Sequence, residues 1–188
     1  MTVTGVVLAA GAGTRMGMPK ALVVRDGVPW VARATRLLLD AGCDRVVVVL
    51  GASFDEARAS VPTDVAVSTV YNGDWSSGMA SSLRAGLAAV SSTAAPGDSA
   101  LVSLVDIPGL PVEAARRVLA TGAALARAVY DGRPGHPVLI SHAHWAPISA
   151  SLTGDRGARA YLDAHGVTDV ECGDLWNGRD IDTSQPVE

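Results

Sequence analysis

Three glycines and two cations gather near the start of the chain, and together they could bind an anion. They are Gly11, Gly13, Arg15, Gly17 and Lys20, and they follow the apolar run Gly5–Ala9. Glycines allow successive backbone N–H groups to curl around a phosphate, and Arg and Lys add charge-assisted contacts to its oxygens. Open α/β sheets also bind their ligands at the carboxyl ends of strands. The sequence therefore predicts a phosphate-binding loop here, the alternative being an ordinary glycine-rich turn with two solvated cations.

The glycine spacing excludes two well-known nucleotide-binding motifs. Gly11, Gly13 and Gly17 read G-x-G-x-x-x-G, which is one residue too long for the dinucleotide fingerprint. The Walker A motif requires a lysine directly after its last glycine, whereas Met18 follows Gly17. The loop is therefore predicted to be a phosphate loop of another kind.

A carboxylate stands at the end of a second apolar run. Asp106 follows Ala100–Val105 and precedes Ile107 and Pro108. A carboxylate at the end of a buried strand needs a charged partner, which makes Asp106 a candidate functional residue. The alternative is an aspartate that only starts a turn before proline.

Other polar positions give weaker signals. The serines of the segment Asn72–Leu83 either contact a ligand or cap the helix that follows. His136 lies in a turn-rich link, where a lone histidine is often only a satisfied polar group. His142 and His144 lack a third ligand in register, so we predict an exposed loop or a helix start there rather than a metal site. The chain has no G-x-S-x-G sequence, so a serine hydrolase is not supported.

The first loop reads L-A-A-G-x-G-x-R-M-G-x-P-K over residues 8–20 and resembles the signature of the molybdopterin-type nucleotidyltransferases. The chain is most similar to their molybdenum cofactor cytidylyltransferase group. Five further blocks match that family in the expected order, so the resemblance covers nearly the whole chain. They are Asn72–Leu83, Val105–Pro108, Arg133–Val138, Thr153–Arg159 and Asp180–Thr183. The last block departs from the pattern at Ser184, where the family commonly has proline.

The resemblance implies a role for each block. Catalytic positions fall on Lys20, Arg15 and Asp106. The metal positions, which hold Mg²⁺ in the family, fall on Asp106 and Asp182, with Asp180 as the alternative to Asp182. The acceptor-binding positions fall on His136, Asp155 and Gly157. The nucleotide-binding positions fall on Leu8, Ala9, Ala10, Gly11, Gly13, Arg15, Lys20, Asn72, Gly78, Met79, Ser81 and Ser82.

The resemblance also implies substrates and partners. CMP would pass from CTP to the phosphate of a molybdopterin-type cofactor, and a molybdenum hydroxylase would receive the product. Relatives that transfer GMP tend to show L-A-G-G in the first loop, whereas this chain has L-A-A-G at residues 8–11, the arrangement associated with CTP. Three alternatives stay open. They are guanylyl transfer from GTP, a nicotine blue type of reductase using a nicotinamide cofactor, and a non-catalytic carrier or chaperone of the molybdenum cofactor.

Length and composition exclude several other classes of protein. The chain has 188 residues, of which 48% are hydrophobic and 18% charged, so it is too apolar to be disordered. We expect one domain, with residues 1–125 as the nucleotide-binding part and 126–188 as the acceptor-side part and tail. A net charge of −4 and 4% aromatics argue against a nucleic-acid partner. No signal peptide or membrane span is recognisable, and the two cysteines form no C-x-x-C pair, so we predict a cytoplasmic protein.

Alternating strands and helices must position these residues. Continuous apolar runs predict strands buried on both faces at Gly5–Ala9, Arg45–Leu50, Val65–Val70 and Ala100–Val105. Apolar stripes predict helices at Trp30–Ala41, Ser81–Val90 and Pro111–Ala124. The later elements are a strand pair at Ala126–Tyr130 and Pro137–Ile140, a helix at Ala158–Ala164 and a strand at Val167–Cys172. The pattern predicts an α/β, Rossmann-like three-layer sandwich with a mostly parallel sheet and a small mixed-strand C-terminal addition, as in nucleotide-diphospho-sugar transferases.

Overall fold

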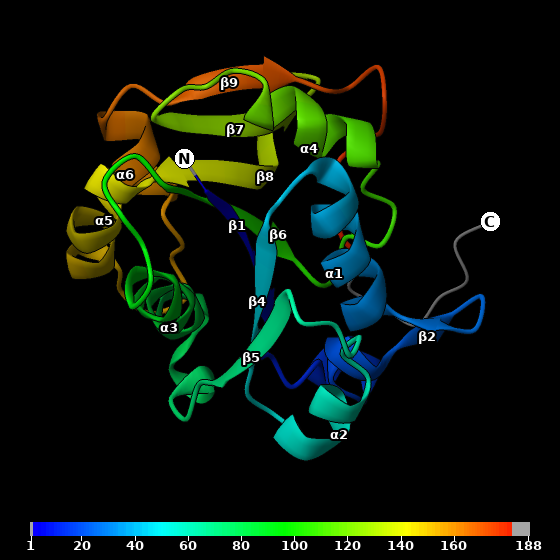
Figure 1. Ribbon diagram of the computed structural model, residues 1–188. Coiled ribbons are helices and arrows are strands. Elements are labelled where there is room, and N and C mark those ends of the chain that lie inside the picture. The colour runs from blue at the N-terminus through cyan, green and yellow to red at the C-terminus, as the bar shows by residue number, and fades with distance from the viewer. Residues whose placement is uncertain (1, 182–188) are drawn as a thin grey trace.

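A seven-stranded, mostly parallel sheet forms the centre of the computed structural model, which describes residues 2–181 (Figure 1). Its strand order is β5-β4-β1-β6-β8-β7-β9. β1 lies parallel to β4 and β6, whereas β8 is antiparallel to both β6 and β7. The strands are β1 (Val3–Ala9), β4 (Arg45–Leu50), β5 (Val67–Tyr71), β6 (Ser99–Leu104), β7 (Leu125–Tyr130), β8 (Arg133–Ser141) and β9 (Thr168–Glu171). The fold class is therefore the predicted one.

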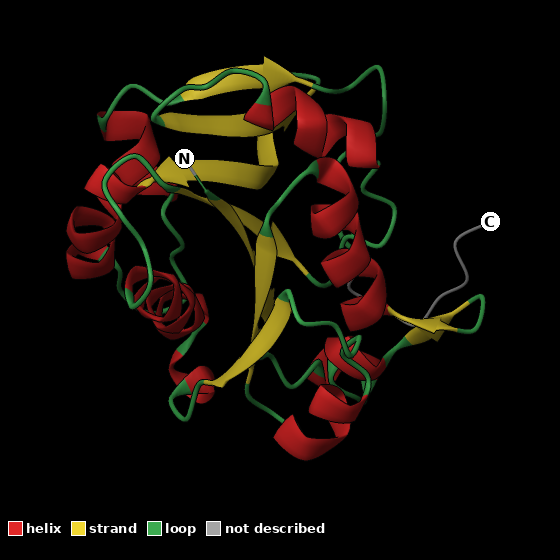
Figure 2. Cartoon of the chain, viewed as in Figure 1, coloured by secondary structure: helices red, strands yellow, loops and turns green. Residues whose placement is uncertain are grey.

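Helices cover both faces of this sheet and complete the three layers (Figure 2). On one face, Val7 of the sheet shares a core with Leu38 of α1 and Val118 of α4. On the other face, side chains of α3, α5 and α6 form a second core. The helices are α1 (Trp30–Ala41), α2 (Phe54–Ala59), α3 (Met79–Ser91), α4 (Val112–Leu119), α5 (Trp145–Ser151) and α6 (Arg159–Ala164). Continuous apolar strands such as β4 follow directly from having a core on each side.

Several predicted elements have the predicted bounds. The helix at Trp30–Ala41 and the strand at Arg45–Leu50 agree residue for residue. The helix ends because Gly42 adopts a left-handed conformation with φ 109° and its N–H turns back to the last carbonyls. The strand pair after residue 125 is an antiparallel hairpin, as predicted, with its turn at residues 131–132.

Three predicted elements are wrong in extent or burial. The strand predicted at Pro137–Ile140 runs from Arg133 to Ser141 as β8, so His136 lies within a strand and not in a turn-rich link; Asp131 and Gly132, both with positive φ, make the turn in two residues. The strand predicted at Val65–Val70 lies at an edge of the sheet as β5 and pairs only with β4, so its residues are half-buried or exposed. The helix predicted at Pro111–Ala124 stops at Leu119, because Gly122 turns the chain with φ 58° and donates to the carbonyl of Leu119. The helix start predicted as one option at His142 and His144 is a 3-10 turn that leads directly into α5, although the helix itself was not predicted. Neither α2 nor the two-stranded hairpin of β2 (Val24–Arg25) and β3 (Val28–Pro29) was predicted.

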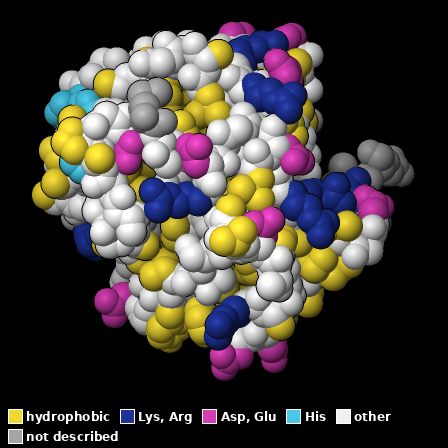
Figure 3. Space-filling view, viewed as in Figure 1, with side chains coloured by type: hydrophobic (Ala, Val, Ile, Leu, Met, Phe, Trp, Pro, Cys, Tyr) yellow, Lys and Arg dark blue, Asp and Glu magenta, His cyan; other side chains and the backbone are white. Residues whose placement is uncertain are grey.

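The surface carries charges of both signs. On the face shown in Figure 3, dark blue cations and magenta carboxylates are interspersed in small groups. Within residues 2–181, no helix is both long and apolar enough to cross a membrane.

Candidate nucleotide site

A cavity of about 460 Å³ opens at the carboxyl ends of β1 and β6. These two strands are hydrogen-bonded neighbours, with Leu8 opposite Leu104, so the loop after β1 and the residues after β6 meet at one edge of the sheet. We call this space the first cavity. Its lining includes most of the predicted site: Leu8, Ala10, Gly11, Gly13, Arg15, Lys20, Gly78, Met79, Ser82, Asp106 and Asp155. It also includes Trp75 and Ser76, which had no role assigned from the family pattern.

The loop after β1 is held in a tight conformation that only glycine fits at one position. Gly13 has φ 60° and precedes a single 3-10 turn at Thr14–Met16, whose Met16 N–H donates to the carbonyl of Gly13 at 2.8 Å. A Cβ atom on Gly13 would lie 2.0 Å from the carbonyl oxygen of Met18, which is an impossible contact. The backbone therefore folds back on itself beside Lys20, and this close approach explains why glycine is needed there.

Lys20 and Asp106 form an ion pair across the first cavity. The Nζ of Lys20 lies 2.8 Å from Oδ2 of Asp106, and both side chains are 18% exposed. The other carboxylate oxygen, Oδ1, is buried and accepts no hydrogen bond from any residue between 2 and 181. A buried oxygen without a donor is costly, so the geometry of Asp106 fits a ligand to a cation.

The metal predicted at this site is consistent with that donor set. Mg²⁺ prefers hard oxygen ligands and is commonly held by one or two carboxylates together with substrate phosphates. Within the described residues no three His, Cys, Asp or Glu side chains gather to hold a metal on their own. Asp106 would therefore supply one ligand. Asp182 lies outside the described residues, so its predicted role stays a prediction.

The last described residue lies against Asp106. The Ile181 N–H donates to the backbone carbonyl oxygen of Asp106 at 2.9 Å. Upstream, the Trp176 ring packs edge-on against Tyr130 at 5.3 Å and lies close against Gly109. The side chain of Asp180 itself is exposed.

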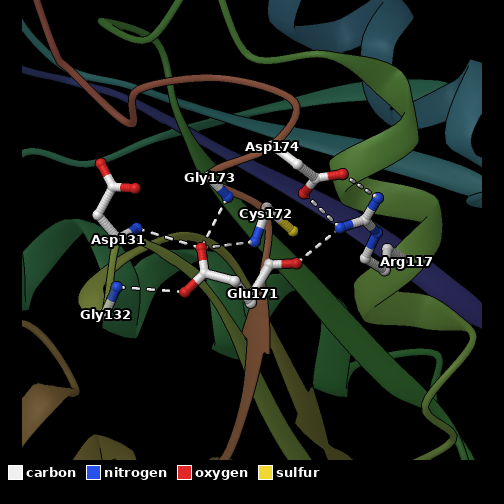
Figure 4. Close-up of polar contacts among 7 residues, drawn as sticks. All are labelled: Arg117, Asp131, Gly132, Glu171, Cys172, Gly173 and Asp174. Carbon is white, nitrogen blue, oxygen red and sulfur yellow. Dashed lines mark hydrogen bonds and ion pairs between the residues drawn. The ribbon is translucent and has the colours of Figure 1, made fainter.

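Glu171, at the end of β9, anchors the start of this C-terminal segment (Figure 4). Its carboxylate accepts hydrogen bonds from the backbone N–H groups of Asp131, Gly132, Cys172 and Gly173. These bonds, that of Gly173 above all, lower the pKa of Glu171. Arg117 donates to the carbonyl of Glu171 and forms a two-point ion pair with Asp174. The hairpin turn and the C-terminal segment are thus tied together.

The segment before α3 is organised by Asn72. Its side-chain amide donates to the hydroxyls of Ser81 at 2.9 Å and Ser82 at 3.1 Å, and its oxygen accepts the N–H of Asp74. Asn72 and Ser81 are buried and do not line the first cavity, whereas Ser82 does. The geometry gives Asn72 and Ser81 a positioning role behind the wall; direct contact with a nucleotide stays a prediction. Ala9 is also buried outside the lining.

Replacing Asn72 with alanine is expected to destabilise the protein by about 1–3 kcal/mol, because the hydroxyls of Ser81 and Ser82 lose a donor and the N–H of Asp74 loses its acceptor. Urea unfolding monitored by circular dichroism measures the change. The matched control is Asn177→Ala, since Asn177 is exposed and only accepts the N–H of Arg179. Equal stability of Asn72→Ala and the control would contradict the positioning role.

Gly78 joins the nucleotide side to the loop that carries Asp155. Gly78 has φ 112°, and a Cβ there would lie 2.4 Å from Oδ1 of Asp155 and 2.6 Å from the backbone of Gly154. The N–H of Ala80 donates to the carbonyl of Gly154 at 3.0 Å. This contact places Asp155, one of the predicted acceptor residues, in the wall of the first cavity.

The other two predicted acceptor residues, His136 and Gly157, line a second cavity of about 190 Å³. Leu8 and Met79 border both cavities, so the two spaces adjoin. Arg127 also lines the second cavity and was not among the predicted site residues. A single charge inside the apolar strand Leu125–Tyr130 was the available signal.

The imidazole ring of His136 is uncharged at neutral pH. The backbone carbonyl of His136 accepts a hydrogen bond from the hydroxyl of Tyr130 at 2.7 Å. Burial lowers the pKa of His136 to about 4, and the nearby charge of Asp106 offsets only part of that effect. At pH 7 the imidazole is therefore neutral and can accept or donate a hydrogen bond without adding charge to the site.

Stability is expected to fall between pH 6.5 and pH 4 because of His136. The unfolded chain, with a histidine pKa of 6.5, binds a proton in this range that His136 in the folded protein does not bind. The contribution of His136 to the free energy of unfolding is therefore present above pH 6.5 and is lost as the pH falls to about 4. Urea unfolding of the wild type and of His136→Gln at several pH values measures the slope. Parallel slopes over this range would contradict the assignment.

Comparison with known proteins adds independent information. The MobA-like NTP transferase domain family matches residues 5–170. The nicotine blue oxidoreductase of Paenarthrobacter nicotinovorans is 39% identical over 96% of this chain and 92% of that protein. The molybdenum cofactor cytidylyltransferase of Escherichia coli K12 is 25% identical over 72% of this chain and 68% of that protein.

Among solved structures, Rv0371c of Mycobacterium tuberculosis H37Rv superposes with a TM-score of 0.83 and 26% identity, over 97% of this chain and 94% of that one. A second structure of the same protein is a complex with manganese, with a TM-score of 0.72 and 25% identity over 92% of this chain and 89% of that one. A divalent metal therefore binds a relative of this fold.

Proposed function

Because this chain belongs to the MobA-like NTP transferase family, we propose that it is a metal-dependent nucleotidyltransferase that moves CMP from CTP to the phosphate of a molybdopterin-type cofactor. The observation that supports this most directly is the pairing of Lys20 with Asp106 beside the folded-back glycine loop. A loop rich in N–H donors, two cations and a carboxylate with an uncommitted oxygen together suit a metal-bound triphosphate.

The proposed reaction is an in-line displacement at phosphorus. An oxygen of the acceptor phosphate forms a bond to the α-phosphorus of CTP, and the bond from that phosphorus to the bridging oxygen breaks, so pyrophosphate leaves with the electron pair. Catalysis of this kind consists mainly of positioning and neutralising charge. Mg²⁺, when bound, would neutralise charge on the triphosphate oxygens.

The chain's own residues supply the remaining parts. The N–H groups of the glycine loop and the guanidinium of Arg15 would hold the β- and γ-phosphates. Lys20 would stabilise charge on the α-phosphoryl group and the departing pyrophosphate once it exchanges Asp106 for the nucleotide. Asp106 would hold the metal together with Asp182, or with Asp180 in its place. The hydrogen bond from the Ile181 N–H to the carbonyl of Asp106 supports a ligand from this part of the chain.

The two adjoining cavities suit two substrates. We assign the nucleotide to the first cavity, which contains both cations of the loop, and the acceptor to the second, with His136 and Gly157 in its wall. Asp155, beside Gly78, would stand where the two meet. The choice of CTP over GTP rests on Ala10, whose methyl group narrows the space beside the base. A molybdenum hydroxylase would then receive the product.

The test is a transfer assay with purified protein, Mg²⁺ and a molybdopterin-type cofactor as the acceptor. CTP labelled at the α-phosphorus should yield labelled cofactor and an equal amount of pyrophosphate, and GTP should yield much less. Pyrophosphate release without labelled cofactor, or transfer from GTP alone, would contradict the proposal.

A second candidate, an oxidoreductase, is favoured by the 39% identity to nicotine blue oxidoreductase. In that case a nicotinamide dinucleotide would occupy the first cavity with its pyrophosphate on the glycine loop, and a flat dye would occupy the second. Oxidation of NADH by the pure protein in the presence of a quinone-like dye tests this candidate. Neither Mg²⁺ nor CTP should affect that rate.

A further inference from the structure

A buried arginine faces the second cavity with one nitrogen uncommitted. Arg127 on β7 is 7% exposed and lines this cavity. Its Nε donates to Asp169 at 2.6 Å and its Nη1 donates to Asp163 at 2.6 Å. Its third nitrogen, Nη2, makes no hydrogen bond to any residue in the part of the chain that the structure describes. Arg127 therefore brings an uncommitted donor to the wall of this cavity.

Stability alone does not account for a charged residue at this position. A buried ion pair is often no more stabilising than well-packed apolar side chains of similar volume. The side chains of Asp163 and Asp169 are 48% and 51% exposed, so both would stay solvated without Arg127. The other side chains of β7 are buried and, apart from the hydroxyl of Tyr130, apolar. The guanidinium is therefore better explained by contact with a ligand that binds in the second cavity.

The walls of the second cavity specify a flat, uncharged group. Leu83, Val138, Ile140 and Leu162 form apolar walls and are all buried. A cavity of roughly 150 Å³ accommodates benzene, so about 190 Å³ has room for a group of one or two rings. Arg159 also lines this cavity; its side chain is 72% exposed and its Nε lies 3.9 Å from Asp163. The carboxylates of Asp163 and Asp169 balance the charges of Arg127 and Arg159, so an added anion would gain little there.

We propose that Arg127 is a specificity-determining residue, whose Nη2 donates a hydrogen bond to a carbonyl oxygen on a flat, uncharged heteroaromatic ring in the second cavity. The identification of this ring as part of the acceptor rests on the proposed function. The cavity itself adjoins the first one at Leu8 and Met79, so a substituent on the ring can extend toward Lys20 and Asp106. Ring binding can be tested without any transfer reaction.

Three probes separate the contributions of shape, carbonyl group and charge. 2-Quinolone is flat and uncharged and carries a carbonyl, indole lacks the carbonyl, and 2-naphthoate carries a negative charge. Methyl resonances of Leu83, Val138, Ile140 and Leu162 report binding in this cavity by NMR titration. The wild type is expected to bind 2-quinolone at least about tenfold more tightly than indole or 2-naphthoate, the size of effect one well-placed hydrogen bond produces.

Two variants and a control make the assignment to Arg127 specific. Arg127→Met keeps an apolar wall and should bind 2-quinolone and indole equally. Arg133→Met, which removes an exposed arginine of β8, should keep the preference. The double variant Asp163→Asn with Asp169→Asn leaves the guanidinium uncompensated and should bind 2-naphthoate at least about tenfold more tightly than the wild type.

An unchanged preference for 2-quinolone in Arg127→Met would overturn the proposal, as would the absence of any methyl shift with folded protein and millimolar probe. A double variant that gains no affinity for 2-naphthoate would overturn the argument from charge compensation. Binding of CTP with Mg²⁺, measured on the same samples, keeps the two proposals apart. Probe binding without CTP binding would count against the nucleotidyltransferase alone, and the reverse would count against the ring site alone.

Discussion

Asparagine in place of Asp106 is expected to lower turnover at least about a hundredfold, which corresponds to about 2.7 kcal/mol of transition-state stabilisation. The substitution removes the charge that faces Lys20 at 2.8 Å and replaces one carboxylate oxygen with an NH₂ group, which is no ligand for a cation. It keeps the size of the side chain, and the backbone bond from Ile181 to the carbonyl of residue 106 does not depend on the side chain. The protein should therefore remain folded. Steady-state kinetics of CMP transfer, with circular dichroism on the same samples, measure both quantities.

The control for this variant is Asp40→Asn, which removes one negative charge from the exposed side of α1. It should leave turnover unchanged. Lys20→Ala should resemble Asp106→Asn in its effect on turnover, since both lose charge neutralisation at the reacting phosphates. Near-normal turnover in either variant would show that the residue replaced is not catalytic.

Alanine in place of Gly13 is expected to weaken CTP binding at least about a hundredfold. The new Cβ would lie 2.0 Å from the carbonyl oxygen of Met18, so the loop must open, and the N–H groups would no longer point at one phosphate. Loss of two or more charge-assisted hydrogen bonds gives an effect of this size. Isothermal titration calorimetry with CTP and Mg²⁺ measures the affinity.

Gly17→Ala is the matched control for that experiment. Gly17 belongs to the same loop and also has a positive φ, 74°, but a Cβ there meets no atom within 4 Å. It should therefore lose stability by about 1 kcal/mol from backbone strain while keeping CTP affinity. Equal losses of CTP affinity in Gly13→Ala and Gly17→Ala would show that strain, rather than the closed shape of the loop, sets the effect.

The fold was predictable wherever a segment has one dominant pattern. The apolar stripe of α1 ends at a glycine, and β4 is an unbroken run of aliphatic residues, so both elements are determined by local sequence. The edge position of β5 was not predictable in this way, because it depends on which strands lie beside it. α5 was missed because Pro147 interrupts its short segment, although it lies within the first turn of the helix.

The candidate site was predictable in its residue types and less so in its contacts. The glycine loop and Asp106 follow separate strands, and their meeting depends on β1 and β6 being neighbours. The sequence could not show that the amide of Asn72 turns inward to Ser81 and Ser82. Arg127 was missed because its partners, Asp163 and Asp169, are distant in sequence. Contacts between distant segments need the folded chain.

The most direct test of the central claim is thermal unfolding with CTP, GTP or NADH, each in the presence and in the absence of Mg²⁺. A ligand at a hundred times its Kd adds about 2.7 kcal/mol, which for a chain of this length raises Tm by roughly 5–11 °C. A nucleotidyltransferase of the proposed kind should show this rise with CTP only when Mg²⁺ is present, and Asp106→Asn should abolish it. A rise with NADH that needs no metal, together with no response to CTP, would contradict the nucleotidyltransferase and support the oxidoreductase.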